Sequence, residues 1–247
     1  MNLPATRDGP RVALSMHGYG QFCPVAVACE VFAERWTPLI LRELFAGSRR
    51  FSEIRRGIPL ISRALLTQRL RHLEDAGVIE SRPAGRGREY RLSQAGAEFH
   101  GVIESLGAWG QRWVHGRASA QNLDAMLLLW NIRRRLAVDR LPDRRIVVRF
   151  EFRGVPAGRG PATSWLVASR QEVDLCLKDP GYGIDLVVAA DLSAFTRVWL
   201  GDVAFNEAIR SRDIRIEGPK DLVRAFPGWL LLSHFAGVER PRPARAS

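Results

Sequence analysis

Residues 62–77 read SRALLTQRLRHLEDAG, and this segment has the start and end signals of a single helix. Ser62 is a residue type that caps the first turn, and Gly77 is the type that favours the position just past the end. At about 100° per residue, the apolar side chains fall on one side. They are Leu66, Leu70 and Leu73. The spacing therefore predicts a helix with a buried leucine seam.

The opposite side of this predicted helix is polar and suited to the edges of DNA bases. It comprises Ala64, Thr67, Gln68 and Arg71, with Arg63 at its edge and Ser62 at the cap. Glutamine can pair bidentately with adenine and arginine with guanine, and each good pair contributes roughly 1 to 3 kcal/mol of discrimination. Arg69 lies on the flank, so we do not expect it to read bases. In an isolated helix such a polar side is most often only solvated, so the neighbouring segments decide its meaning.

The segments before this helix predict two more helices and a short turn. An apolar helix is expected over residues 25–35, and a second begins at Thr37 as N-cap with Pro38 as its first residue. Residues 51–56 form a short amphipathic turn. The buried side of the second helix is expected to consist of Leu39, Leu41, Leu44 and Phe45.

The segments after it predict a hairpin and a long helix. Two strands, Val78–Arg82 and Tyr90–Leu92, are joined by residues 83–89, which are rich in Gly and Arg. A long helix then runs from Gln94 to about Trp113, with apolar residues at steps of three and four. This order of helices followed by a hairpin is that of a mostly α-helical winged helix-turn-helix domain.

Basic residues concentrate around the predicted helix and hairpin. The chain has 37 Lys and Arg against 26 Asp and Glu, a net charge of +11, and residues 49–91 hold 11 Arg against 5 acidic residues. We expect Arg86 and Arg88 at the hairpin tip to reach phosphate or a narrow minor groove. Further phosphate contacts, which set affinity and salt dependence, are expected from Arg49, Arg50, Arg55 and Arg56. Because 35 of the 37 basic residues are Arg, coding bias is a second explanation of the total charge.

Four segments carry a resemblance to a known family: Cys23–Ala26, Glu34–Leu44, Arg50–Ile54 and Leu66–Ile79. Through them, residues 22–114 resemble the HxlR family of bacterial winged-helix transcriptional regulators. The resemblance implies a homodimer that binds pseudo-palindromic, double-stranded promoter DNA and forms through its N-terminal helix and the helix after the wing. Large apolar side chains on the latter helix fit a partner, although packing on the second half of the chain would also cover them. They are Leu106, Trp109 and Trp113.

The second half of the chain changes its period. After a helix capped by Asn122, apolar residues alternate by two from Ile146 to Phe152. Strands followed by helices are typical of an α+β domain. The expected strands are 165–169, 173–178, 184–190 and 214–216, and the expected helices are 193–200, 205–212 and one from residue 221. The predicted organisation is an N-terminal arm (1–21), a winged-helix domain (22–116), an α+β domain (122–238) and a disordered tail (239–247).

Part of the second half resembles the sterol-carrier-protein-like fold, over about residues 145–235. The similar segments read DLSAFTRVWLG (191–201), FNEAI (205–209) and IRIEGP (214–219), in the order helix, helix, strand and glycine. The resemblance implies an apolar tunnel between sheet and helices for a fatty or sterol-like molecule. The candidate lining residues are Phe195, Trp199, Phe205, Ile209 and Phe226. Ordinary core packing is the alternative for each of them.

Cys23 stands at the start of the first predicted helix, next to Pro24. A thiol at a helix N-terminus can have a lowered pKa and react with oxidants. Some HxlR-type proteins are thiol-based sensors with a cysteine in this region, so the alternatives for Cys23 are redox sensing and simple packing. Cys29 is expected to lie in the core.

Signatures of catalysis and of membrane insertion are missing from the sequence. The five histidines and three cysteines lack metal-ligand spacing, and neither a phosphate-binding loop nor a Gly-x-Ser-x-Gly elbow is found. We expect no enzyme activity, cofactor or metal. Without a secretory signal or a long apolar run, we expect a cytoplasmic protein with no membrane partner. The sequence predicts a dimeric DNA-binding regulator controlled by an apolar small molecule; the alternative is a lipid carrier whose winged helix serves only dimerisation.

Overall fold

The computed structural model describes residues 18–114 and 122–239. The chain splits into two compact units, one ending at Leu106 and the other beginning at Gly107. The division falls inside helix α6 (His100–Trp109), earlier than the boundary that we expected at residues 116–121. All of that expected boundary, the first 17 residues of the expected arm and all but the first residue of the expected tail lie outside the described residues.

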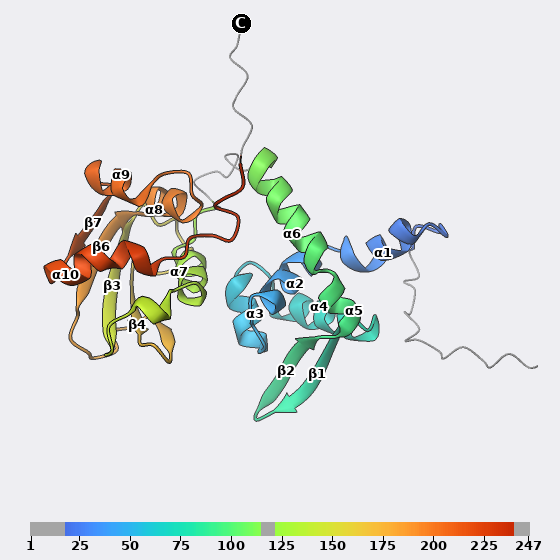
Figure 1. The fold of residues 1–247 in the computed structure, drawn as a ribbon. Coiled ribbons are helices and arrows are strands. Elements are labelled where there is room, and N and C mark those ends of the chain that lie inside the picture. The colour runs from blue at the N-terminus through green and yellow to red at the C-terminus, as the bar shows by residue number, and fades with distance from the viewer. Residues whose placement is uncertain (1–17, 115–121, 240–247) are drawn as a thin grey trace, which may run out of the picture. The chain divides into compact units, whose positions relative to one another are not determined.

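The N-terminal unit is a winged helix-turn-helix, as predicted (Figure 1). Its wing is an antiparallel hairpin of β1 (Ile79–Ala84) and β2 (Gly87–Leu92), which projects from the helices. The helices before the wing are α1 (Pro24–Phe32), α2 (Thr37–Phe45), α3 (Phe51–Gly57) and α4 (Arg63–Asp75). The wing is followed by α5 (Gln94–Glu98) and the beginning of α6.

The core of this unit forms around the leucine seam of α4. The seam is buried as its spacing predicted, and it packs with Ile40, Leu41 and Leu44 of α2. The expected burial of Leu39 is wrong, because this side chain is 37% exposed. Residues 40, 41 and 44 share one face of a helix, whereas a step of two residues turns Leu39 about 200° away from Leu41.

Helix α2 begins one residue earlier than predicted. Trp36, rather than Thr37, is the N-cap, with a left-handed φ of 81°. Thr37 is the first helical residue and is fully buried. Pro38 thus lies one position further into the first turn, where its missing N–H still breaks no helical hydrogen bond.

Two other expectations about this unit need correction. The hairpin has a turn of only Gly85 and Arg86, because the strands extend to either side of them, and Gly85 takes a φ of +60° that glycine adopts without steric cost. The long helix after the wing is broken at Phe99, between α5 and α6, and the Phe99 ring stacks on Phe32 with centroids 5.3 Å apart. Beyond α6, residues Gly110–Val114 form a π-helical turn.

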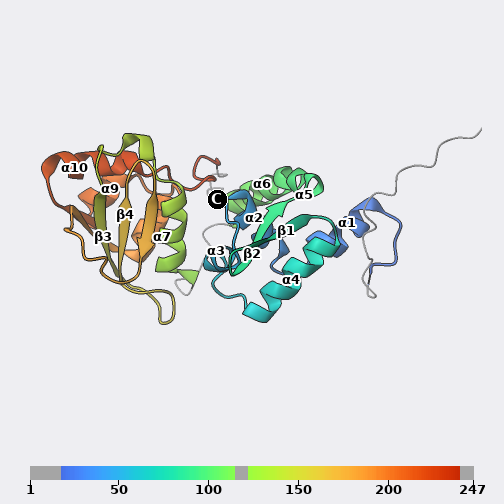
Figure 2. The same ribbon diagram turned by 90° about the horizontal axis from the view of Figure 1, so that it is seen from below.

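The C-terminal unit contains a five-stranded sheet in the order β5-β4-β3-β6-β7. Strands β3 and β6 are parallel and the other neighbours are antiparallel; β3 and β4 lie side by side in Figure 2. The strands are β3 (Ile146–Arg153), β4 (Thr163–Ala168), β5 (Val173–Cys176), β6 (Leu186–Asp191) and β7 (Ile214–Glu217). The expected elements are present, with ends that differ by about two residues.

The helices of this unit pack on one face of the sheet through a single apolar core. They are α7 (Ala125–Arg134), α8 (Leu192–Trp199), α9 (Phe205–Arg210) and α10 (Lys220–Ala225), with short 3-10 turns at Val138–Arg140 and Phe226–Trp229. Helix α7 is capped by Asp124 and not by Asn122, because the Asp124 carboxylate accepts a hydrogen bond from the Leu127 N–H at 2.8 Å. Among residues 18–114 and 122–239, no helix has the length and apolar character needed to cross a membrane.

Candidate nucleic-acid interface

Helix α4 presents a polar face on the side opposite its buried leucines. Arg63, Ala64, Gln68 and Arg71 are exposed, and Thr67 is half-buried. Within the described part of the chain, the side chains of Gln68 and Arg71 make no hydrogen bond and remain available for contacts with base edges. The carboxamide of Gln68 and the guanidinium fork of Arg71 supply donors and an acceptor of the kind that base recognition in a major groove requires.

Two hydroxyl groups expected at this face have structural roles. Ser62 Oγ accepts a hydrogen bond from the Leu65 N–H at 3.2 Å, which makes it the N-cap of α4. Thr67 Oγ1 donates to the Arg63 carbonyl at 2.9 Å. Contacts from this face to a ligand would therefore come from its longer side chains, those of Arg63, Gln68 and Arg71.

Arg69 lies away from this face. Its Nη2 is 2.6 Å from the Glu34 carboxylate, and its Nε donates to the Arg35 carbonyl at 3.2 Å. Arg69 thus connects α4 to the segment between α1 and α2 and does not belong to the exposed face that carries Gln68.

The four expected phosphate contacts differ in their surroundings. Arg49 is half-buried and donates to the Leu44 carbonyl at 2.7 Å, so its guanidinium covers the end of α2. Arg50 and Arg56 are exposed at the two ends of α3, whereas Arg55 is half-buried. Arg50 and Arg56 have the accessibility that a phosphate contact needs.

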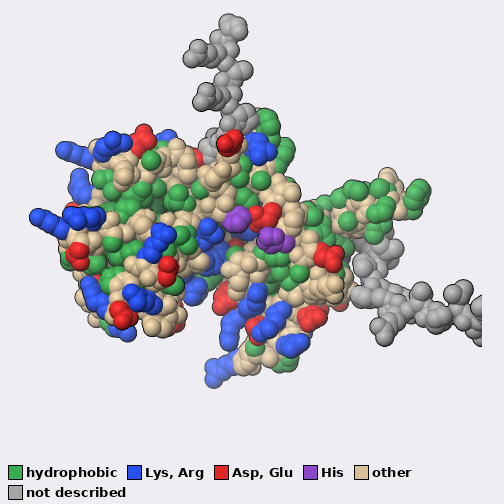
Figure 3. Space-filling view, viewed as in Figure 1, with side chains coloured by type: hydrophobic (Ala, Val, Ile, Leu, Met, Phe, Trp, Pro, Cys, Tyr) green, Lys and Arg blue, Asp and Glu red, His purple; other side chains and the backbone are tan. Residues whose placement is uncertain are grey.

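The wing carries two exposed arginines besides the two predicted at its tip, and basic side chains cover the hairpin (blue in Figure 3). Arg86 is exposed at the turn, and Arg88 is bound to Glu74 and Ser81. Arg82 and Arg91 are also exposed, with Glu80 and Glu89 as ion-pair partners at 3.9 and 3.0 Å. Alternation by two along each predicted strand could have revealed both of these residues.

A buried polar cluster fixes α3 against α2. Glu43 is fully buried and pairs with Arg42 Nη2 at 2.9 Å, and the same Nη2 donates to the Gly57 carbonyl at 2.8 Å. Ser48 Oγ donates to the Glu43 carboxylate at 3.3 Å. A buried carboxylate is stabilised only when it is paired and hydrogen-bonded, so this cluster constrains the helix-turn-helix. This cluster was not predicted from the sequence.

Comparison with known proteins covers this unit. Residues 31–118 match the HxlR-like helix-turn-helix family. The HTH-type transcriptional regulator YvaP of Bacillus subtilis (strain 168), which is uncharacterized, is 33% identical over 98 residues, or 38% of this chain and 91% of YvaP. This chain belongs to the HxlR-like helix-turn-helix family.

Other relatives match the same HxlR-like region. The uncharacterized HTH-type transcriptional regulator Rv3095 of Mycobacterium tuberculosis (strain H37Rv) is 40% identical over 93 residues, which are 36% of this chain and 58% of Rv3095. The match thus spans rather more than half of that relative's length. A crystal structure of the regulator ytcD covers 36% of this chain and 94% of ytcD at 37% identity, with a TM-score of 0.34.

Cys23 is the exposed N-cap of α1 in the HxlR-like unit. Hydrogen bonds from the backbone N–H groups of Ala26 and, to a lesser extent, Val25 lower the pKa of its thiol. The expected core position of Cys29 is wrong, because Cys29 is half-buried in a helix that has no buried residue. Burial and the nearby charge of Asp174 raise the pKa of Cys176 in the C-terminal unit.

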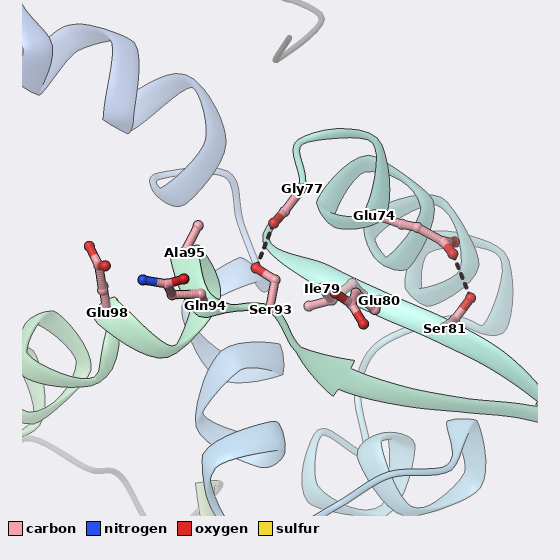
Figure 4. Close-up of a pocket in the computed structure, with 9 residues that line it drawn as sticks. All are labelled: Glu74, Gly77, Ile79, Glu80, Ser81, Ser93, Gln94, Ala95 and Glu98. Atoms are coloured by element: carbon pink, nitrogen blue, oxygen red, sulfur yellow. Dashed lines mark hydrogen bonds between the residues drawn. The ribbon is translucent and has the colours of Figure 1, made fainter. Parts of the chain in front are cut away.

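A groove of about 750 Å³ runs along the end of α4, β1 and the start of α5 in the HxlR-like unit (Figure 4). Its lining includes three carboxylates, those of Glu74, Glu80 and Glu98. Their negative charge makes this groove unsuitable for the phosphates of DNA. The polar face of α4 and the exposed wing tip therefore remain the candidate interface.

The HxlR-like match ends at residue 118, before the aromatic residues considered as a ligand pocket. Phe195 and Phe226 are fully buried, and the Phe205 ring lies 6.1 Å from each of theirs. Trp199 is 7% exposed, while Ile209 on α9 is 37% exposed. A pocket of about 560 Å³ in this unit is lined by other residues, from β4, β5 and the loop that contains Tyr182. Among the described residues, no three His, Cys, Asp or Glu side chains are grouped as metal ligands.

Proposed function

We propose that this chain is a sequence-specific DNA-binding transcriptional regulator in which α4 reads the major groove and the wing contacts the adjacent backbone. The observation that carries the proposal is the two-sided character of α4. Its leucines are buried, whereas Arg63, Gln68 and Arg71 are exposed together on the other side. The HTH-type regulators that match this unit support the same reading.

The proposed regulator acts as a homodimer. Helix α1 has no buried residue, and Phe22 and Val25 next to and within it are 102% and 69% exposed. On α6, Leu106 and Trp109 are 49% and 56% exposed. Apolar side chains of this size on two helices favour a partner surface, and a second copy would place two α4 helices on half-sites about 34 Å apart.

Control by an apolar small molecule is the second part of the proposal. The order α8, α9, β7 and Gly218, on which the resemblance to the sterol-carrier-like fold depends, is present in the C-terminal unit. Native mass spectrometry of the purified full chain tests this part. A bound fatty or sterol-like species that is lost in Phe195→Asp but retained in Leu177→Asp, an exposed loop position, would support it. An unliganded mass after incubation with such molecules would count against it.

The regulatory function itself is tested by sequencing genomic fragments that the protein retains at about 150 mM salt, where indiscriminate phosphate attraction is screened. We expect a pseudo-palindromic motif enriched in promoters, and its loss in the double variant Gln68→Ala/Arg71→Ala. Retention of fragments without any motif would contradict sequence-specific reading. It would instead favour the lipid carrier, which flotation with anionic lipid vesicles would then detect.

A further inference from the structure

One hydrogen-bonded cluster joins the end of α4 to both strands of the wing. Ser81 Oγ on β1 donates to Glu74 Oε1 at 2.6 Å, a contact drawn in Figure 4. Arg88 on β2 donates from Nε to Ser81 Oγ at 2.7 Å and from Nη2 to Glu74 Oε1 at 3.1 Å; its Nη2 also contacts Ser81 Oγ. We refer to Glu74, Ser81 and Arg88 as the wing latch.

The register of the hairpin brings these side chains together. Ser81 is opposite Tyr90, and Pro83 is opposite Arg88. Because residues two apart on a strand point to the same face, Ser81, Arg88 and Tyr90 share one face, which Glu74 contacts from the last turn of α4. The pKa of Tyr90 is raised, mainly by burial, and the charges of Arg88, Glu74 and Arg71 also act on it. The two elements therefore interact closely along this face.

The contacts of Arg88 change the role that the sequence suggested for it. A guanidinium has five N–H donors, and those on Nε and Nη2 of Arg88 are directed at Ser81 and Glu74. The Glu74 carboxylate also compensates its charge. Arg86, in contrast, is exposed at the turn, and its side chain makes no hydrogen bond within the described part of the chain.

We infer that Arg88 is a positioning residue, which holds the wing against α4 through Glu74 and Ser81, and that Arg86 is the wing arginine that contacts phosphate. This inference rests on the proposed DNA-binding function. Ordering a mobile segment on binding is one of the costs that reduce affinity. Because the latch already holds both strands of the hairpin against α4, the wing needs little further ordering when it binds DNA. The latch thus sets the position from which Arg86 meets the DNA backbone.

The test uses the full-length protein and a duplex that the wild type selects from a random-sequence pool, with affinity measured as a function of salt. Each phosphate contact contributes about 0.9 to the slope of log affinity against log salt. Glu74→Gln and Arg88→Ala should each weaken binding about three- to tenfold with an unchanged slope, as expected from added ordering without loss of a contact. Arg86→Ala should lower the slope by about 0.9.

Two further variants separate positioning from general damage to the domain. Glu80→Gln changes a neighbouring glutamate of β1 outside the latch, and it should leave affinity and slope unchanged. The exchange Glu74→Arg/Arg88→Glu reverses the ion pair, so it should recover affinity lost in Arg88→Glu alone. A glutamate at a true phosphate contact would repel DNA whichever residue occupied position 74.

Three results would overturn part or all of this assignment. Tighter binding and a slope steeper by about 0.9 in Glu74→Gln would mean that the released Arg88 contacts phosphate. Unchanged affinity in every latch variant, with the expected effect of Arg86→Ala, would mean that the latch does not position the wing. If the wild type selects no motif and Arg86→Ala leaves the slope unchanged, the proposed DNA-binding function fails, and the role of the latch fails with it.

Discussion

The carboxylate of Glu43 occupies the space that a side chain at Gly57 would need. A Cβ atom at Gly57 would lie 1.9 Å from Glu43 Cδ and 2.0 Å from its Oε2. The end of α3 therefore approaches the buried cluster of α2 through a glycine, and Arg42 donates to both residues. The placement of α3, and of the turn that leads into α4, depends on this contact.

Gly57→Ala should destabilise the N-terminal unit by about 1 to 3 kcal/mol, as overpacking of a filled site does. The measurement is hydrogen exchange across a urea series, which gives the urea concentration at which the amides of α2 and α3 lose half of their protection. Gly101→Ala is the matched control: a Cβ there meets no atom within 4 Å, so the helix should gain up to about 1 kcal/mol. Equal midpoints for both variants would contradict the close approach.

Leu106→Asp should dissociate the proposed homodimer, because a carboxylate would replace an apolar side chain at the partner surface. We expect the dimer dissociation constant, measured by sedimentation equilibrium, to rise at least about tenfold. Leu177→Asp is the control, since Leu177 is 46% exposed against 49% for Leu106 but lies in a loop of the other unit. A dimer that tolerates Leu106→Asp, or that Leu177→Asp dissociates, would refute this surface.

Cys23 should react with iodoacetamide at lower pH than Cys176. Backbone N–H groups at the start of α1 lower the pKa of Cys23, whereas burial and Asp174 raise that of Cys176. A lowered pKa leaves more thiolate at a given pH, and the thiolate is the reacting species. Mass spectrometry of alkylated peptides across a pH series gives both midpoints. The difference should vanish in urea, and equal midpoints in the folded chain would argue against the assigned cause.

Local spacing was sufficient to predict the parts of the fold that one element determines. The leucine seam and the Ser62 cap of α4 are set by residues within a few turns of one another, and both are confirmed. The strands of the C-terminal unit are predicted in the same way, from the alternation of apolar and polar residues by two. The predicted burial of Leu39 is wrong because hydrophobicity alone does not show whether Leu39 or the adjacent Ile40 faces the core.

Features that depend on distant pairing could not be read from the sequence. Glu74 and Arg88 are 14 residues apart and meet only through the hairpin register. Arg49 and Arg50 are adjacent arginines in the same basic segment, so the sequence predicts the same role for both. The contact of Arg49 with the Leu44 carbonyl depends on how α2 ends, which the sequence does not show. The parallel pairing of β3 with β6 likewise requires the intervening strands to be placed first. The sequence therefore predicts which face of α4 is free more reliably than the role of each arginine.

If α4 reads DNA bases, changing a side chain on its exposed face should change which base sequence the protein prefers. Gln68 lies on that face, whereas its neighbour Arg69 is bound to Glu34, so Arg69→Ala is the control for effects on overall affinity. Wild type, Gln68→Ala and Arg69→Ala would each select duplexes from the same random-sequence pool. Wild type and Arg69→Ala should enrich one pseudo-palindromic motif, while Gln68→Ala should relax one position of each half-site by about 1 to 3 kcal/mol. The same motif from wild type and Gln68→Ala, or a change of motif confined to Arg69→Ala, would contradict reading by this face of α4.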